Sequence, residues 1–171
     1  MCPKRRYYKF RSNKDKYSIE QTNFATAAIN TWTQIPAEDD TQITSYQWNI
    51  DVVPPSDFQG MRKVKHLTIS LCNPGSTNEN QALVYNIIYV PQGYDVQSIR
   101  FPAPGYAQSN YQANQFVMSS GVIDFSAGPT RIHSRLSRNL NSGDRIVCLL
   151  ASPGGSASGI IGQISYAITL Q

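Results

Sequence analysis

The stretch IIGQISYAITL, Ile160–Leu170, alternates apolar and polar side chains along its length. One face of an extended chain would carry its main apolar residues, which are Ile160, Ile164, Tyr166, Ile168 and Leu170. The opposite face would carry polar residues, which are Gln163, Ser165 and Thr169. Because successive side chains of a strand point to opposite faces, this pattern predicts a half-buried β-strand.

Similar apolar and β-branched runs, separated by turn-forming residues, predict seven more strands upstream. They cover about Tyr17–Gln34, Ser45–Val53, Arg62–Cys72, Ala82–Val90, Ala113–Asp124, Arg131–Ser137 and Asp144–Ala151. The first of them is expected to bend midway. Ala82–Val90 reads ALVYNIIYV, with almost no polar interruption, which is typical of a strand buried on both faces. Since the spacings leave no room for helices between the strands, we expect an all-β protein of eight strands.

The 171 residues suffice for one hydrophobic core, and no internal repeat or linker divides them. We therefore expect a single domain over residues 17–171, preceded by an arm over residues 1–16. No stretch approaches the roughly 20 apolar residues of a membrane span, and the N-terminus lacks the apolar segment of a signal peptide. Cys72 and Cys148 lie in apolar runs and are expected to be free thiols, in a protein kept in a reducing compartment.

Positive charge is concentrated at the N-terminus. Residues 1–16 hold seven Lys or Arg and one Asp, a net charge of +6, whereas the remaining residues hold eight basic and ten acidic side chains. The formal net charge of +4 therefore belongs entirely to the arm. A basic arm on a slightly acidic body is typical of a segment that binds a polyanion.

Aromatic residues are interleaved with the cations of this arm, and rings of this kind can stack on unpaired bases while the cations neutralise phosphates. The candidate nucleic-acid-binding residues of the arm are Lys4, Arg5, Arg6, Tyr7, Tyr8, Lys9, Phe10, Arg11, Lys14 and Lys16. Two other interpretations remain open. One is a solvated terminus without a ligand; the other is a nuclear-import signal built around Lys4, Arg5 and Arg6, which is compatible with nucleic-acid binding.

Catalytic chemistry has little support in the sequence. The two histidines, His66 and His133, lie in predicted strands without His or Cys partners at metal-ligand spacing. The acidic cluster Glu38, Asp39 and Asp40 lies in a polar loop, and no nucleophile elbow, phosphate loop or dinucleotide-binding glycine motif occurs. We expect a protein that is not an enzyme and has neither a catalytic residue, a metal site nor a cofactor.

Five stretches of the chain, taken in order, are similar to the capsid proteins of small circular, replication-initiator-encoding single-stranded DNA viruses, the group that includes the circoviruses. They are NKDKYSIEQT (Asn13–Thr22), VVPPSDFQGMRKVKHLTISL (Val52–Leu71), ALVYNIIYVPQG (Ala82–Gly93), NYQANQFVMSSGVID (Asn110–Asp124) and RIHSRLSRNLNSGDRI (Arg131–Ile146). They cover most of the domain, although none is diagnostic alone. The arm departs from the family, because many relatives carry a long arginine tract where this chain has a short mixed segment.

The resemblance implies an eight-stranded viral jelly roll with strands B to I in two sheets, BIDG and CHEF. It further implies self-assembly into a T=1 icosahedral shell that packages circular single-stranded DNA, with the protein in the virion and, during assembly, in the host nucleus. The host receptor stays unknown. Two alternatives come from other functional classes. One is a carbohydrate-binding jelly roll that uses Trp32, Trp48, Tyr94 and Tyr106, and the other is a monomeric single-strand-binding protein.

Further cations are expected to join the arm on a surface of the sandwich. Arg131, His133 and Arg135 alternate with Ile132 and Leu136, so we expect the basic side chains outside and the two apolar ones in the core. If the two strands are D and G, as the resemblance implies, a basic interior surface would contain Arg62, Lys63, Lys65, Arg131 and Arg135.

Two observations allow other arrangements of these basic side chains. Lys63 and Lys65 share strand parity with Leu67 and Ile69, so one face of that strand should be mixed. The basic side chains could instead be solvated, or they could pair with acidic groups of neighbouring subunits.

Overall fold

A computed structural model of the chain describes residues 17–27, 29–34, 43–72, 82–96, 116–124, 128–152 and 159–170. The described residues form ten strands and no helix, which confirms the all-β class. No helix in these ranges is long and apolar enough to cross a membrane. The arm residues 1–16 lie outside the described ranges.

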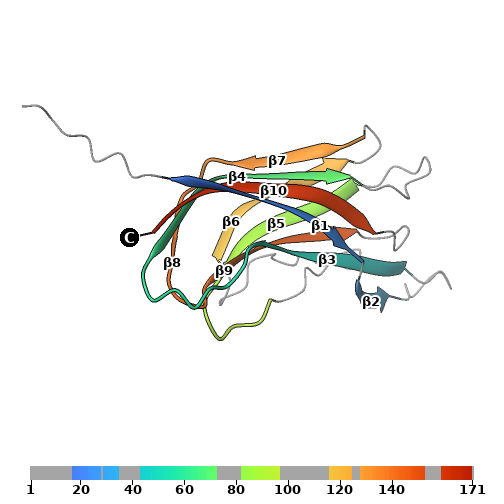
Figure 1. Ribbon diagram of the computed structural model, residues 1–171. Helices are drawn as coiled ribbons and strands as arrows, with labels where there is room; N and C mark the ends of the chain where they lie inside the picture. Colours follow the sequence, from blue (N-terminus) through green and yellow to red (C-terminus); the bar gives the residue numbers. More distant parts are fainter. Residues whose placement is uncertain are drawn as a thin grey trace, which may run out of the picture.

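The strands form two antiparallel sheets that face each other (Figure 1). In the first sheet the strand order is β1-β10-β4-β7, and β8 also pairs with β4. The bounds are β1 Ser18–Thr26, β10 Ile160–Leu170, β4 Arg62–Cys72, β7 Thr130–Ser134 and β8 Arg138–Leu140. In the second sheet the strand order is β2-β3-β9-β5-β6. The bounds are β2 Ile29–Gln34, β3 Ile43–Val53, β9 Arg145–Ser152, β5 Ala82–Val90 and β6 Phe116–Asp124. Because neighbouring strands come from distant parts of the chain, the architecture is a jelly-roll-like sandwich.

Two of the predicted strands are each divided in the structure. The run predicted over Tyr17–Gln34 forms β1 in the first sheet and β2 in the second, so the expected bend is a crossing between layers. The strand predicted over Arg131–Ser137 ends at Ser134, and pairing with β4 resumes only at Arg138. This gap lies opposite an irregular part of β4, where a continuous hydrogen-bonded ladder cannot form.

The irregularity is a β-bulge at His66. Ser165 pairs with Thr68 and Ala167 pairs with Lys65, so two residues of β4, His66 and Leu67, lie opposite the single residue between them in β10. His66 has a φ of 55°, in the left-handed region that a side chain with a Cβ rarely occupies. The extra residue shifts the alternation of β4 by one position.

This shift resolves the mixed face expected for β4. Before the bulge Val64 is buried and its neighbours Lys63 and Lys65 are partly exposed, whereas after it Leu67, Ile69 and Leu71 are buried. The lysines and the apolar residues therefore occupy opposite faces despite their shared parity in sequence.

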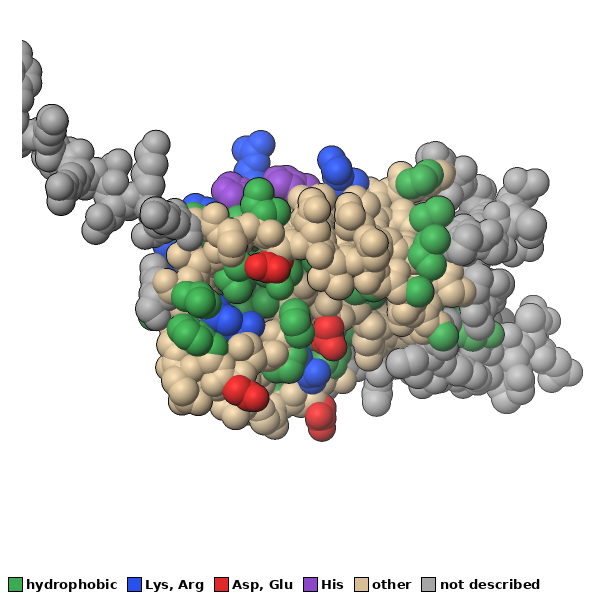
Figure 2. Space-filling view, viewed as in Figure 1, with side chains coloured by type: hydrophobic (Ala, Val, Ile, Leu, Met, Phe, Trp, Pro, Cys, Tyr) green, Lys and Arg blue, Asp and Glu red, His purple; other side chains and the backbone are tan. Residues whose placement is uncertain are grey.

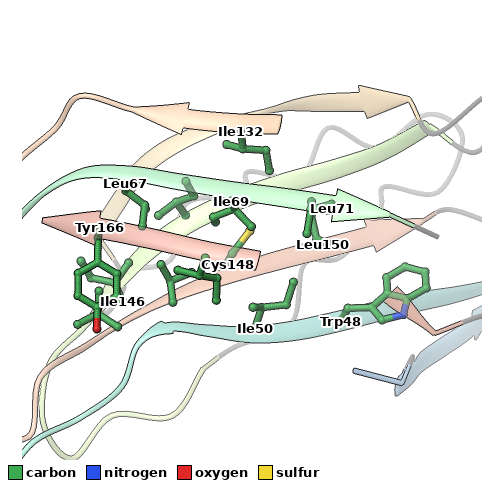
Figure 3. Packing of buried hydrophobic residues seen from close by; sticks show 14 of the residues in the cluster. Trp48, Ile50, Leu67, Ile69, Leu71, Ile132, Ile146, Cys148, Leu150 and Tyr166 are labelled. Carbon is green, nitrogen blue, oxygen red and sulfur yellow. The ribbon is translucent and has the colours of Figure 1, made fainter. Parts of the chain in front are cut away.

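The core lies between the two sheets. Figure 3 shows Leu67, Ile69 and Ile132 of the first sheet pointing toward Cys148 and Leu150 of the second. All of these side chains are buried, and complete burial of one such aliphatic side chain contributes about 1.5–3 kcal/mol. Cys72 and Cys148 carry free thiols.

The outer face of the second sheet holds another apolar cluster. Ile88 and Val90 of β5 pack there with Val147, Leu149 and Ala151 of β9, while Leu83 and Ile87 of β5 belong to the central core. The prediction that Ala82–Val90 is buried on both faces is thus confirmed for the second half of the strand. By contrast with the outer face of the second sheet, the outward face of the first sheet is rich in polar side chains.

Candidate nucleic-acid interface

The strand register identifies which side chains share the outward face of the first sheet. One transverse row consists of Asn23, Gln163, Ser70 and Arg131, and the next row consists of Gln21, Ser165, Thr68 and His133. A third row contains Ile19, Ala167 and Lys65. These rows lie opposite the core because their neighbours Ile69, Ile132 and Ile164 are buried. None of the outward positions in the three rows carries an acidic residue.

Basic side chains gather on the β4 and β7 part of this face, which we call the cationic face and define by Lys63, Lys65, His66, Arg131 and His133. The lysines are partly exposed and the other three side chains are exposed. Figure 2 shows both histidines with Lys and Arg side chains along the upper rim of the molecule, while the acidic side chains in view lie away from that rim.

On the cationic face, His133 has a neutral hydrogen-bond partner. The Thr68 Oγ1 and His133 Nδ1 atoms are 3.0 Å apart, so a hydrogen bond joins β4 to β7 there. Within the described ranges, none of Lys63, Lys65 and Arg131 forms an ion pair with a carboxylate. The face therefore presents positive charge that the described part of the protein does not neutralise, as a surface for phosphates requires.

Tyr17 connects the arm to this surface. The Lys65 Nζ atom lies 3.4 Å from the centre of the Tyr17 ring, within the range of a cation–π interaction. Since Tyr17 directly follows residues 1–16, the arm joins the folded domain beside the cationic face. The arm residues proposed to bind nucleic acid, Lys4 to Lys16, lie outside the described residues.

Arg62 does not belong to the cationic face, contrary to the expectation from sequence. Its side chain is 5% exposed, and its guanidinium donates hydrogen bonds of 3.0 Å to the Pro54 carbonyl and 2.8 Å to the Asp144 carbonyl. Val64 and Arg62 share the inward parity of β4 before the bulge, which explains this placement. A buried guanidinium held by two backbone carbonyls cannot reach a phosphate on the outer surface.

Residues after Ser134 also differ from the prediction. Arg135 is exposed but follows the end of β7, so strand alternation does not place it on the cationic face. Leu136, which was expected in the core, is 50% exposed because it too lies in the segment between β7 and β8. Ile132 is buried and Arg131 and His133 are exposed, as predicted.

A buried polar network at one end of the sandwich was not expected from the sequence. The Asp144 carboxylate, 4% exposed, accepts hydrogen bonds from the Tyr89 hydroxyl at 2.8 Å and from the backbone N–H groups of Asn141 at 2.8 Å and Gln92 at 3.1 Å. Burial and the neighbouring Asp144 raise the pKa of Tyr89. The turn residues Asn141–Gly143 were the available signal, since an Asp after such a turn often accepts hydrogen bonds from it.

Arg138 of β8 lies beside this network. Its guanidinium carbon is 4.1 Å from the centre of the Tyr89 ring and 5.4 Å from that of Phe116, and the two rings are 5.8 Å apart. Arg138 thus packs on aromatic faces of the second sheet. This cation has a structural partner and is separate from the cationic face.

No protein-family model matches the sequence, and no curated protein is similar to it. Among solved structures, that of infectious bursal disease virus Gt strain matches with 9% sequence identity and a TM-score of 0.32. The match covers 91% of this chain and 32% of the other, so the chain spans about a third of that protein's length. The assignment of the fold therefore depends on the strand order and register described above.

Metal binding finds no support in the described ranges, where no group of three or more His, Cys, Asp or Glu side chains could hold an ion. The two histidines lie instead among Lys and Arg side chains on the cationic face. Their surroundings suit an anion rather than a cation.

Proposed function

We propose that the protein is a viral coat protein that assembles into a T=1 icosahedral shell and packages circular single-stranded DNA. The observation that carries this proposal is the cationic face, whose three outward rows carry no acidic residue, with Tyr17 and the basic arm joined to it at Lys65. Sequence-independent phosphate contacts from this face would supplement the arm, which is short for the family it resembles.

The strand order supports the jelly-roll assignment. The path β1-β10-β4-β7 corresponds to sheet BIDG, and β3-β9-β5-β6 corresponds to sheet CHEF, with β2 added at an edge. In the capsid family that the sequence resembles, the BIDG sheet faces the particle interior. The cationic face lies on the outward surface of this sheet and would then face the genome. The proposed role is structural and needs neither catalysis nor a cofactor.

The carbohydrate-binding alternative loses one of its candidate aromatic residues. Trp48 is 1% exposed and packs in the core, so its ring cannot stack on a sugar. Tyr94 is 48% exposed, whereas the Trp32 side chain and Tyr106 lie outside what the structure describes. A monomeric single-strand-binding protein would use the same cationic face and is therefore the stronger alternative.

Negative-stain microscopy of the purified protein separates these functions. Closed particles of uniform diameter, with nuclease-protected DNA inside, are expected of a coat protein. A monomer at every protein and salt concentration would contradict the shell. Sequencing the protected nucleic acid tests the second half of the proposal, because predominantly RNA content would exclude selective DNA packaging.

A further inference from the structure

Both histidines of the chain lie on the cationic face. The whole sequence holds two, His66 and His133. Register places His133 in the outward row of Thr68, one row away from Lys65, and the β-bulge of β4 inserts His66 between Lys65 and the buried Leu67. Both imidazoles are exposed. Histidine is the side chain that ordinarily changes its charge between pH 5 and 8, so this change is confined to one surface of the protein.

A hydrogen bond orients the His133 ring. Its Nδ1 atom lies 3.0 Å from the Thr68 Oγ1 atom. In a protonated imidazole both ring nitrogens carry a hydrogen, so Nδ1 donates to the threonine hydroxyl and Nε2 keeps a donor for a ligand. Because the side chain is exposed, that donor is accessible. Protonation of His133 therefore adds a charged donor in an orientation that the strand pair holds.

His66 occupies the bulge with a φ of 55°. Glycine or asparagine adopts this backbone conformation at a lower cost than histidine. Bulges commonly re-aim a side chain, and this one adds an exposed imidazole directly after Lys65. The position thus carries an ionisable side chain where the backbone alone favours glycine. A role for the imidazole at this surface accounts for it.

The charged groups on the face of the two imidazoles are basic. Strand β4 contributes Lys63 and Lys65, with the Tyr17 ring against the second of them, and β7 contributes Arg131. The outward residues of β10 and β1 in these rows are neutral. Among the described outward positions of the rows, no carboxylate competes with a ligand for a protonated imidazole.

The nearest other charged residues belong to different surroundings. Glu20 of β1 pairs with Tyr166 and shares the inward parity of that buried ring. Arg138 of β8 packs on the Tyr89 ring, and Arg135 is exposed in the segment that follows β7. The two imidazoles therefore lie in a positive environment in which an anion is the missing partner.

We propose that nucleic acid binds to the cationic face with uptake of protons by His66 and His133, so that acid pH strengthens binding. The inference rests on the proposed nucleic-acid binding and adds its regulation by pH. A phosphate beside an imidazole favours the protonated form, and protonation by reciprocity favours the phosphate complex. The three permanent cations Lys63, Lys65 and Arg131 become five positive charges when both histidines are protonated.

The test measures the binding of oligothymidine without a terminal phosphate to the full chain at pH 5.5 and 7.5, one unit on either side of the ordinary pKa of histidine. This strand has no group that titrates in the range, so a change in affinity reports on the protein. His66→Asn with His133→Gln removes both imidazoles, and asparagine tolerates the positive φ. His66→Asn with His133→Lys is the matched control, because it keeps a permanent charge at position 133. Circular dichroism at both pH values checks that each variant is folded.

The unmodified chain should bind at least about fivefold more tightly at pH 5.5, since one hydrogen bond from a charged group corresponds to about tenfold in affinity. The variant without imidazoles should bind equally at both pH values. The lysine control should also be independent of pH and should bind more tightly than that variant at pH 7.5. Calorimetry of the unmodified chain at pH 6.5, in two buffers of different ionisation enthalpy, should show proton uptake on binding.

Absence of proton uptake would overturn the inference and leave the proposed function intact. The same pH dependence in the variant without imidazoles would overturn it as well. Absence of oligothymidine binding to the unmodified chain at both pH values would instead overturn the proposed nucleic-acid binding.

Discussion

The Lys65 ammonium caps the Tyr17 ring at 3.4 Å, which joins the last residue before β1 to the middle of the cationic face. A contact of this kind contributes about 0.5–1 kcal/mol at an exposed site. It holds the attachment point of the arm on the same surface that carries Lys63 and Arg131. Under the proposed function, arm and sheet would bind one strand of nucleic acid together.

Deleting residues 1–14 should leave a soluble, β-rich protein that packages less nucleic acid. The deleted segment contains six of the fifteen basic residues and has no apolar periodicity that would pack in a core. Circular dichroism and the ratio of absorbance at 260 and 280 nm in purified particles check the two parts. A matched control keeps the arm length and replaces its Lys and Arg with Gln. Equal nucleic-acid content in the deletion and the unmodified protein would exclude the arm as the packaging element.

Replacing Lys63, Lys65 and Arg131 together with Gln should weaken binding and flatten its salt dependence. Each phosphate contact on a single strand contributes about 0.7 to the slope of log K against log salt, so three lost contacts lower the slope by about 2. Titrations with oligothymidine at several salt concentrations measure this. As a control, Arg145→Gln removes one charge from the second sheet and should change the slope less than Arg131→Gln. Normal nucleic-acid content with defective shells would assign the face to subunit contacts.

The bulge residue His66 should respond to substitution in a characteristic order. His66→Gly should be neutral or stabilising by up to about 1 kcal/mol, because glycine adopts positive φ freely, and His66→Val should cost about 1–2 kcal/mol. Deleting His66 should be tolerated, because it leaves Leu67 alone opposite Tyr166 and restores regular alternation, with Lys63 and Lys65 still on the outer face. Urea unfolding followed by Trp fluorescence ranks the variants. A deletion variant that fails to fold would show that His66 is not simply an extra residue in an otherwise regular strand.

Removing the Asp144 carboxylate should destabilise the domain by about 1–3 kcal/mol or more. Asp144→Ala leaves the Tyr89 hydroxyl and the N–H groups of Gln92 and Asn141 without their acceptor, and an unsatisfied buried donor is costly. Tyr89→Phe removes one partner of the same network and should cost only about 1 kcal/mol. Chemical denaturation gives both values. Equal losses for the two variants would mean that the backbone donors find other partners.

Alkaline pH should destabilise the folded protein through the buried thiol of Cys148. Burial raises its pKa from 9.0 to about 12, so the folded state holds this proton more tightly than the unfolded state. The protonated thiol's contribution to the free energy of unfolding is fully present below pH 9. It is lost as the pH rises toward 12, by at most about 4 kcal/mol. Cys148→Ala should be less stable at pH 7 but should lose less between pH 9 and 11. Parallel pH profiles for the two proteins would contradict this assignment.

Local patterns were sufficient to predict several elements to the residue. The bounds of β4, Arg62–Cys72, and of β5, Ala82–Val90, follow from apolar runs that end at turn residues, and the same alternation predicted the outward position of Arg131 and His133. These features depend on neighbours within a few residues. The basic composition of the arm likewise belongs to the sequence alone.

The tertiary structure decided which side chains share a surface. The bulge at His66 places Lys63 and Lys65 outside and Arg62 inside, because a strand's alternation shifts where two of its residues oppose one of its partner. Asn23, Gln163, Ser70 and Arg131 come from four strands and meet only through sheet register. Asp144 is buried among partners from separate segments, since Tyr89, Gln92 and Asn141 all donate hydrogen bonds to it. Register and burial depend on partners distant in the chain, so no local pattern could have specified them.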